Sequence, residues 1–508
     1  MQPSSVSHQL AAPHHESAGG GRQLVVLLLV CMAILLDAID TGIVNVALPT
    51  IQHDLQLSTL DLPWIQGAYV LTLGGFLLLG GRSADLFGRR RIFLIGTAIF
   101  GLASLISGLA TSGWLLILAR GVQGIGAALT LPSALSILTT TFVEGPKRNQ
   151  AMGIYVATAA SGFSFGLILG GLLTTFLSWH WVFYVNVPFA LLILLLGPVM
   201  IKESHSQLGS RSYDLAGAIT VTAGVLLLVY AITQSTQSSA TLWRTIGLFA
   251  SSLLLLVVFV LIEWRSKSPL IPLRIFRSRT TNAANVGSFA LLGAFFSFMF
   301  IVTLYLQEVL HYSPLLASLA LMPAGIASIP VCVLLTPRLV NRLGMRLSAV
   351  LGLLCLALGI ALFTRIGPSS DYLGIILLPT LVTIALGMSI GYPALSIAAV
   401  SGIANEEQGL VAGLQATALQ VGGGLWLAIT TAVVVGSSVQ TQAVGSQAST
   451  AAVQAQLTGF HLGLLVVALV AAAGALIVLV GIQHPPAAAP QASAAAPQAL
   501  EEEAVPRP

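Results

Sequence analysis

Long apolar runs recur along the chain, separated by short polar segments. Each run approaches or exceeds the roughly 20 residues that an α-helix needs to cross a lipid bilayer. The first run carries two aspartates and is too long for the apolar core of a signal peptide, so we interpret it as a membrane helix and not as a cleaved signal. The pattern predicts about fourteen spans, at residues 24–48, 64–81, 92–111, 114–139, 149–173, 181–200, 214–234, 243–263, 284–306, 315–336, 346–365, 373–396, 409–436 and 461–482.

The composition agrees with this interpretation. Of the 508 residues, 56% are hydrophobic and 7% are charged, and the mean hydropathy is +0.93, whereas a soluble domain is roughly 25% charged. These values exclude a cytosolic globular enzyme, a nucleic-acid binder and a disordered protein. They predict an all-α polytopic protein in the lipid bilayer. The largest loops between spans, 201–213 and 264–282, are too short for a catalytic domain, so we expect no enzyme.

Most of the basic residues fall on one side of the predicted membrane. If the N-terminus is cytoplasmic, eighteen of the 21 lysines and arginines fall in inner loops or tails. Arg244 and Arg365 fall in outer loops, and Arg120 lies within a span. Because cytoplasmic loops of membrane proteins are normally basic, the distribution predicts an even number of spans. It also predicts a multi-pass protein of the plasma membrane with both termini in the cytoplasm.

Polar residues inside the first span follow one helical stripe. Asp37, Asp40, Thr41 and Asn45 stand at positions i, i+3, i+4 and i+8, which places them on one side of a helix. Two carboxylates so close cannot both ionise cheaply. The stripe therefore indicates a group that binds and releases protons, with Asn45 at or near a substrate cavity. The alternative is an acidic stripe that only contacts water near the outer mouth.

Arg120 is the other charge within a predicted span. It lies about 9 Å below the outer edge of the fourth span, and Asp40 lies about 26 Å above the inner edge of the first. In a core of about 30 Å these depths are comparable, so we predict that Arg120 faces the Asp37/Asp40 stripe. Gln123 shares its face. The alternative is an arginine that extends to the outer headgroups.

The loop between the second and third spans has the spacing Gly-x-x-x-Asp-x-x-Gly-Arg-Arg. Its members are Gly81, Asp85, Gly88, Arg89 and Arg90. Gly88 permits a tight turn, and Asp85 can pair with the basic cluster or a helix end. We predict a gating loop. For the arginines alone, a positive-inside loop explains the pattern equally well.

Two further sets of residues are candidates. In the fifth span, Gly162, Gly166 and Gly170 repeat every four positions, with Gly171 beside them, and form a smooth face for close helix packing. A specific role in antiport is the alternative for these glycines. In the ninth span, Gln307 and Glu308 lie near the outer end, where Glu308 could help form the mouth of a cavity. A solvated helix end is the alternative for Glu308.

Several of these motifs resemble those of a known family. The segments 39–49, 81–91 and 120–124 resemble the first-helix, loop and fourth-helix motifs of the major facilitator superfamily, in particular of its fourteen-span drug:proton antiporter branch. Segments 305–314 and 409–423 are similar to the same branch. In that family the fourth-helix arginine, here Arg120, is implicated in proton transfer.

The resemblance implies a major facilitator fold. Two six-helix halves with internal inverted repeats, 23–200 and 283–482, are expected to be joined by two linker helices and cytoplasmic loops in 201–282. Residues 1–22 and 483–508 are expected to be disordered cytoplasmic tails. The loop at 338–344 faintly resembles 85–91, as an internal repeat requires.

The chain departs from the family at two places. Leu167 stands where the fifth-helix antiporter motif has proline, and Gly42 follows Thr41 where the family has a hydroxyl residue. The missing proline weakens the antiport interpretation without removing it. Gly42 and the additional charge of Asp37 could shift the proton affinity or the preference for substrate charge.

The function expected from these residues is proton-coupled efflux of hydrophobic drugs or antibiotics. The alternatives are a proton symporter or facilitator for a small metabolite and, from another class, a membrane-embedded enzyme or an assembly scaffold. We expect protons, a small hydrophobic substrate and lipid as partners, and no nucleic acid. Neither the nine histidines nor the three cysteines have metal-ligand spacing, so we expect no metal and no cofactor. We expect a monomer.

Overall fold

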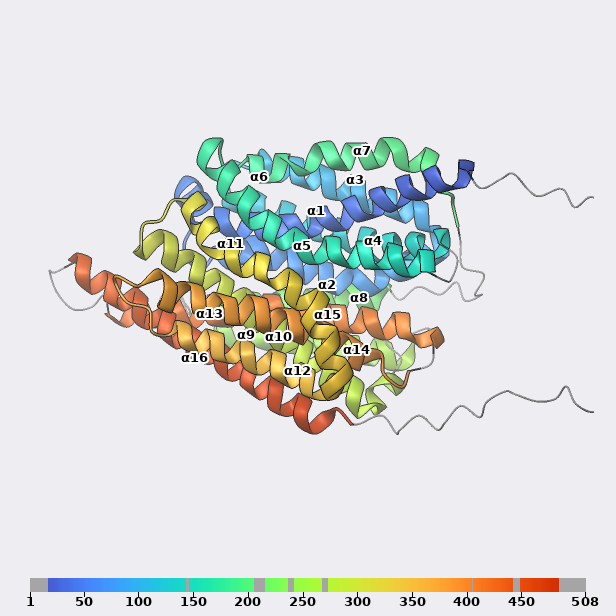
Figure 1. Cartoon of the computed structure of the whole chain (residues 1–508). Coiled ribbons are helices and arrows are strands. Elements are labelled where there is room, and N and C mark those ends of the chain that lie inside the picture. Colours follow the sequence, from blue (N-terminus) through green and yellow to red (C-terminus); the bar gives the residue numbers. More distant parts are fainter. Residues whose placement is uncertain are drawn as a thin grey trace, which may run out of the picture.

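The computed structural model describes residues 17–142, 146–204, 215–235, 242–266, 273–403, 405–441 and 448–483. These residues form a bundle of long helices (Figure 1). The helices of the first half are α1 (Ser17–Leu55), α2 (Leu62–Phe87), α3 (Arg89–Gly108), α4 (Gly113–Thr141), α5 (Pro146–Phe176), α6 (Trp181–Tyr184) and α7 (Asn186–Met200). The next two are α8 (Leu215–Ser235) and α9 (Leu242–Arg265).

The second half contains helices with irregular turns. They are η1 (Leu273–Arg277), α10 (Arg279–Leu304), η2 (Tyr305–Val309), α11 (Pro314–Pro330), η3 (Val331–Leu335), α12 (Thr336–Phe363), η4 (Tyr372–Leu377), α13 (Leu378–Thr380), η5 (Leu381–Met388), α14 (Ser389–Val400), α15 (Asn405–Thr441) and α16 (Ala448–Gly481). The elements η2, η3, η4 and η5 are π-helical turns continuous with their neighbours.

The helices account for the fourteen predicted spans. Twelve described segments are long and apolar enough to cross a membrane. One of them, Pro314–Phe363, contains two spans that turn at Gly344, where φ is +78°. The fourteenth span is α5, of which Ser161–Phe176 is the apolar part identified in the described residues. The prediction of about fourteen membrane helices is confirmed.

Contacts group α1–α7 into one bundle and α10–α16 into another, which we call the N-terminal and C-terminal bundles. The two bundles meet where α2 packs on α15 and α5 packs on α11. We call the end of the molecule where α1 begins and α16 ends the terminal end, and the opposite end the far end (Figure 1).

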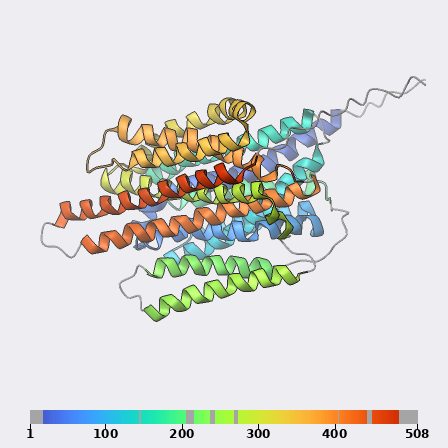
Figure 2. The ribbon, with the colours of Figure 1, turned by 90° about the horizontal axis from the view of Figure 1, so that it is seen from below.

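The helices α8 and α9 lie side by side along one flank of the bundles (Figure 2). Helix α8 contacts both α2 and α15, whereas α9 packs mainly on α8. Trp243 and Trp264, near the two ends of α9, are 82% and 71% exposed. Their 21-residue separation corresponds to about 32 Å of helix, close to the thickness of the hydrocarbon core. Tryptophan is enriched at both membrane interfaces, so the spacing fits a helix that faces lipid.

One predicted boundary is wrong. Residues 17–22, expected in a disordered tail, belong to α1. The side chain of Arg22 joins the start of α1 to the end of α7, because it donates to the main-chain carbonyls of Met200 at 2.8 Å and Val199 at 3.3 Å. The rest of both predicted tails lies outside the described residues, apart from Gln483.

Candidate functional site

A buried ion pair joins α1 to α4. Arg120 and Asp40 are both fully buried, and their Nη1 and Oδ2 atoms are 2.5 Å apart. Gln123 donates to Asp40 Oδ1 at 2.8 Å, and Asn186, the first residue of α7, donates to the same oxygen at 3.0 Å. Asp40 therefore accepts three hydrogen bonds from two other helices, as a buried charge requires.

The guanidinium of Arg120 is held on several sides. Its Nε donates to the main-chain carbonyl of Ile65 at 2.9 Å, and its Nη1 also donates to Gln123 Oε1 at 2.7 Å. Its Cζ lies 4.3 Å from the ring centroid of Tyr69 and 5.8 Å from that of Phe183, within cation–π range. The predicted contact between Arg120 and the aspartate stripe is present. The alternative, an arginine at the outer headgroups, is wrong.

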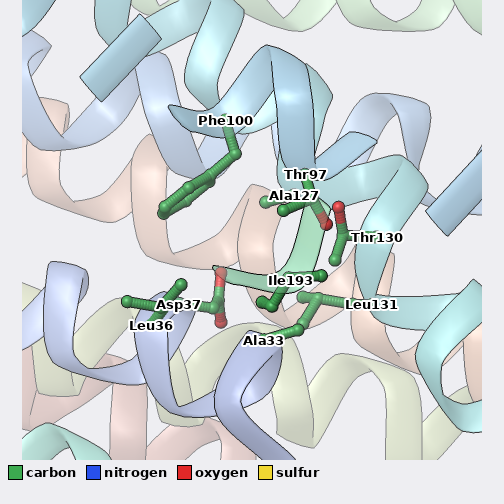
Figure 3. Close-up of a pocket in the computed structure, with 9 residues that line it drawn as sticks. All are labelled: Ala33, Leu36, Asp37, Thr97, Phe100, Ala127, Thr130, Leu131 and Ile193. Atoms are coloured by element: carbon green, nitrogen blue, oxygen red, sulfur yellow. The ribbon is translucent and has the colours of Figure 1, made fainter. Parts of the chain in front are cut away.

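Asp37 lies one turn from Asp40 in different surroundings. It is half-buried, and its Oδ1 accepts a hydrogen bond from the hydroxyl of Tyr69. A cavity of about 10 Å³, lined by Asp37, Thr97, Phe100, Thr130 and neighbouring apolar side chains, lies beside it (Figure 3). This volume is about the size that one water molecule requires. Asp37 thus differs from Asp40 in having a water-sized space beside its carboxylate.

The other two residues of the α1 stripe, Thr41 and Asn45, differ in their hydrogen bonding. Thr41 donates to the main-chain carbonyl of Asp37 at 3.1 Å, whereas the amide of Asn45, fully buried, has no hydrogen-bond partner among the described residues. Gln307 lies nearby, since it donates to the carbonyl of Val46 at 2.9 Å. Glu308 is apart from this group. It is half-buried and accepts from Gln456 of α16 at 2.5 Å, so it is not simply a solvated helix end.

The predicted gating loop is a tight turn between α2 and α3. Gly88 has φ +106°, a conformation that glycine adopts easily. Arg89 pairs with Asp85 at 3.2 Å. Arg90 contacts the end of α7 instead: its main-chain N–H donates to Glu203 at 3.0 Å, and its side chain donates to carbonyls of that segment. Gly81 has no comparably close contact, because a Cβ there would be 3.6 Å from Pro132.

The glycine face of α5 packs against α1. A Cβ at Gly166 would lie 2.5 Å from the carbonyl oxygen of Ile39, and one at Gly170 would lie 2.8 Å from that of Ile43. Gly162 approaches Ala38 in the same way, and Gly171 instead faces α11. Helix packing explains these glycines, and Leu167, in place of the motif proline, is buried among them.

Sequence reasoning missed four members of the site. Tyr69, Ser104 and Asn186 complete the network around Asp40, Asp37 and Gln123, and Glu203 holds the α2–α3 turn. A signal existed for Asn186, a polar residue within an apolar span, but a single polar residue does not reveal its partner. Among the described residues, no group of three or more histidine, cysteine or acidic side chains could hold a metal ion.

Comparisons with known proteins agree with the geometry. The family model of the Major Facilitator Superfamily matches residues 30–427. The chain belongs to this superfamily. It is 37% identical over 418 residues to the puromycin resistance protein pur8 of Streptomyces alboniger, covering 81% of each chain. It is 37% identical over 406 residues to the cephamycin export protein CmcT of Amycolatopsis lactamdurans, covering 79% of this chain and 83% of that one.

Solved structures of two transporters share the fold. A bacterial homologue of the human lysosomal transporter Spinster superimposes with a TM-score of 0.64 at 17% identity, covering 91% of this chain and 97% of that one. The nucleoside transporter NupG has a TM-score of 0.61 at 13% identity, covering 90% and 100%. This superfamily protein therefore has the major facilitator fold predicted from its motifs.

Proposed function

We propose that this protein exports hydrophobic drugs or antibiotics across the plasma membrane in exchange for protons. One observation carries the proposal. Asp40 accepts three hydrogen bonds, one of them within its ion pair with Arg120, whereas Asp37, one turn away, is half-buried beside a water-sized cavity. The relatives named as puromycin resistance and cephamycin export proteins support the direction and the kind of substrate.

Charge balance explains how this pair would sense protons. With both carboxylates ionised, Arg120 compensates one of the two negative charges, so the site carries a net charge of −1. Protonation of Asp37 brings the net charge to zero. A buried net charge is unfavourable in a medium of low dielectric constant, so loss and gain of this proton would favour different arrangements of α1, α2 and α4. A proton driven through 100 mV supplies about 2.3 kcal/mol.

Aromatic side chains at the junction of the two bundles suit a hydrophobic substrate. Phe163 of α5 and Phe295 of α10 have ring centroids 5.4 Å apart. The carbonyl oxygen of Phe163 lies against Gly42 of α1, so a molecule bound beside Phe163 would lie close to the helix that carries Asp37 and Asp40.

The terminal end is proposed to be cytoplasmic, because the predicted inner loops with most lysines and arginines lie there. The far end would then face outward. A proton would then enter from the far end while the substrate is released to that side, so the two would cross the membrane in opposite directions.

The proposal is tested by accumulation in an efflux-deficient bacterial host. Cells that express the protein should accumulate less ethidium or puromycin than cells with an empty vector, and a protonophore should remove the difference. Asp37→Asn should abolish export, since it cannot exchange a proton. The matched control Asp371→Asn retains the hydrogen-bonding side chain that caps η4 and should export normally.

Other outcomes would count against the proposal. Accumulation unchanged across a broad panel of dyes and antibiotics would contradict drug export. Protonophore-sensitive uptake of a small metabolite would instead favour the symporter alternative.

A further inference from the structure

Polar side chains without a partner in the described protein gather in one part of the N-terminal bundle. Asn45 and Gln66 have no partner for either amide atom, and the same holds for Ser107 Oγ, Arg120 Nη2 and Asn186 Oδ1. All five residues are at most 1% exposed. Buried polar atoms are rarely left without a hydrogen bond, and where the protein supplies none, ordered water commonly does.

These residues are arranged regularly around the charge network. Ser107 stands one turn beyond Ser104 on α3, Gln66 one turn beyond Tyr69 on α2, and Asn45 one turn beyond Thr41 on α1. Ser104, Tyr69 and Thr41 each make a hydrogen bond in or beside the network. In each helix the unpartnered residue lies on the same face as the partnered one, displaced toward the far end.

The direction follows from where each helix ends. Helix α3 ends at Gly108 and α2 begins at Leu62, both at the far end. Ser107 is therefore in the last turn of α3, and Gln66 lies about 6 Å along α2. Arg120 lies about 10 Å along α4, which begins at Gly113. The unpartnered atoms thus extend inward from near the far end to the ion pair.

The chemistry of these atoms identifies the ligand. The set contains donors, at Asn45 Nδ2, Gln66 Nε2 and Arg120 Nη2, and acceptors, at Asn45 Oδ1, Gln66 Oε1 and Asn186 Oδ1. An anion would require donors and a cation acceptors. Water uses both kinds of group at once.

We propose that ordered waters connect the far end of the N-terminal bundle to the Asp40/Asp37 pair and deliver the exchanged proton inside this bundle, apart from the substrate junction. The second part rests on the proton coupling proposed above. A proton that enters at the far end passes from water to water by exchange of hydrogen bonds, and a carboxylate oxygen of the pair accepts it. The water that gave up the proton regains one from its neighbour, so no other reactant is needed.

The first test detects the water without transport. Hydroxyl radicals generated by a pulse of X-rays label side chains next to bound water, and mass spectrometry locates the label. Tyr69 and Phe298 are both at most 1% exposed. After correction for intrinsic reactivity, we expect Tyr69 to be labelled at least about fivefold faster than Phe298, and Asn45→Leu with Gln66→Met to remove the difference. Equal labelling in the unsubstituted protein would overturn the proposal of ordered water.

The second test separates proton movement from substrate movement in liposomes. With puromycin as the probe, Gln66→Met and Ser107→Ala should slow proton flux, followed by internal pyranine, by at least about tenfold. Exchange of labelled for unlabelled puromycin, which moves no net proton, should stay within twofold of the original. Asn285→Leu is the matched control, because both amide atoms of Asn285 on α10 are also buried without a partner. It should alter neither rate.

The outcomes distinguish the two proposals. Coupled proton flux that persists in both variants would overturn the route through the N-terminal bundle and leave the proposed function intact. If the unsubstituted protein moves puromycin without protons, the proposed coupling fails and the route fails with it, while the labelling result still decides whether the water is there.

Discussion

Asp37 and Asp40 lie three residues apart on α1 but differ in their surroundings. Asp40 is enclosed by donors from α4 and α7, whereas Asp37 receives one hydrogen bond, from Tyr69, and adjoins a cavity. Asp40 thus stabilises the position of Arg120, and we propose that Asp37 is the carboxylate that changes its charge. The stripe predicted from sequence contains both residues, but spacing alone could not assign these separate tasks.

Substitution of each aspartate should therefore affect different properties. Asp40→Asn leaves Arg120 without its counter-charge in the protein interior, which costs about 3–5 kcal/mol, so the detergent-solubilised protein should melt at a clearly lower temperature. Asp37→Asn keeps the ion pair and should melt within about 2 °C of the original while losing proton-coupled export. Melting is followed by fluorescence-detected gel filtration after heating. Equal loss of thermal stability in the two variants would contradict the division of tasks.

The partners of Arg120 illustrate what sequence can and cannot predict at this scale. Charge and depth sufficed to predict that Arg120 meets the aspartate stripe, because an isolated charge in the membrane is costly. Tyr69 and Asn186 were not predicted. Their inclusion depends on how α2 and α7 are rotated about their axes, and the packing of whole helices decides that rotation.

The packing of α5 against α1 depends on one face of α5. Its glycines bring its backbone against that of α1, so the helix carrying Asp37 and Asp40 has a defined position relative to α5. The four-residue period of small residues predicted a packing face, and it did not reveal that α1 is the main partner.

A Cβ on this face should disturb the site. Gly166→Ala places a methyl group 2.5 Å from the Ile39 carbonyl oxygen, and such overpacking costs about 1–3 kcal/mol. We expect a lower melting temperature and export reduced several-fold. Gly153→Ala on the same helix is the control, since a Cβ there meets nothing within 4 Å. Equal export by the two variants would show that α5 does not position α1.

Helix α8 makes an analogous contact on the flank. Leu71 of α2, Val225 of α8 and Ala428 of α15 form one small apolar cluster, so α8 contacts both bundles. Gly75 of α2 lies directly against Thr222 of α8.

A pair of substitutions tests whether this contact matters. Gly75→Ala should lower the melting temperature, because its Cβ would overlap the side chain of Thr222. Adding Thr222→Ala should restore part of the loss, since it removes Oγ1, the nearest atom, and Cγ2, while the Cβ at 2.9 Å remains. The double-variant cycle measures the coupling energy directly, and additive effects would mean that α8 is not held at this point.

At the scale of the whole molecule, much of the architecture is predictable from the sequence. Fourteen spans followed from apolar length, and the turn at Gly344 repeats in the C-terminal bundle the left-handed glycine conformation found at Gly88. The relative position of the two bundles did not follow. It depends on contacts between residues more than 100 positions apart, such as Gln307 with Val46 and Leu315 with Thr175.

These contacts between the bundles close the far end. Gln307 binds the α1 backbone, and the main-chain N–H of Leu315 donates to Thr175 Oγ1 at 3.2 Å. Gly171 packs against Ser318 in the same region. At the other end of the same span, no residue of η3 (Val331–Leu335) is buried. The two bundles are therefore in contact at the far end, and under the proposed orientation export requires α5 and α11 to separate there.

Joining α5 to α11 at the far end should stop the cycle. In a variant lacking the three native cysteines, Thr175→Cys and Leu315→Cys would be connected by a short bis-methanethiosulfonate reagent, which forms a reducible disulfide with each thiol as methanesulfinate leaves. We expect export to fall by more than about 90% after complete cross-linking and to return after reduction, because the bundles can then separate again. Each single-cysteine variant, treated with the same reagent, should export normally. Full export by the cross-linked protein would mean that substrate leaves without opening of the α5–α11 contact, and the proposed exit at the far end would have to be abandoned.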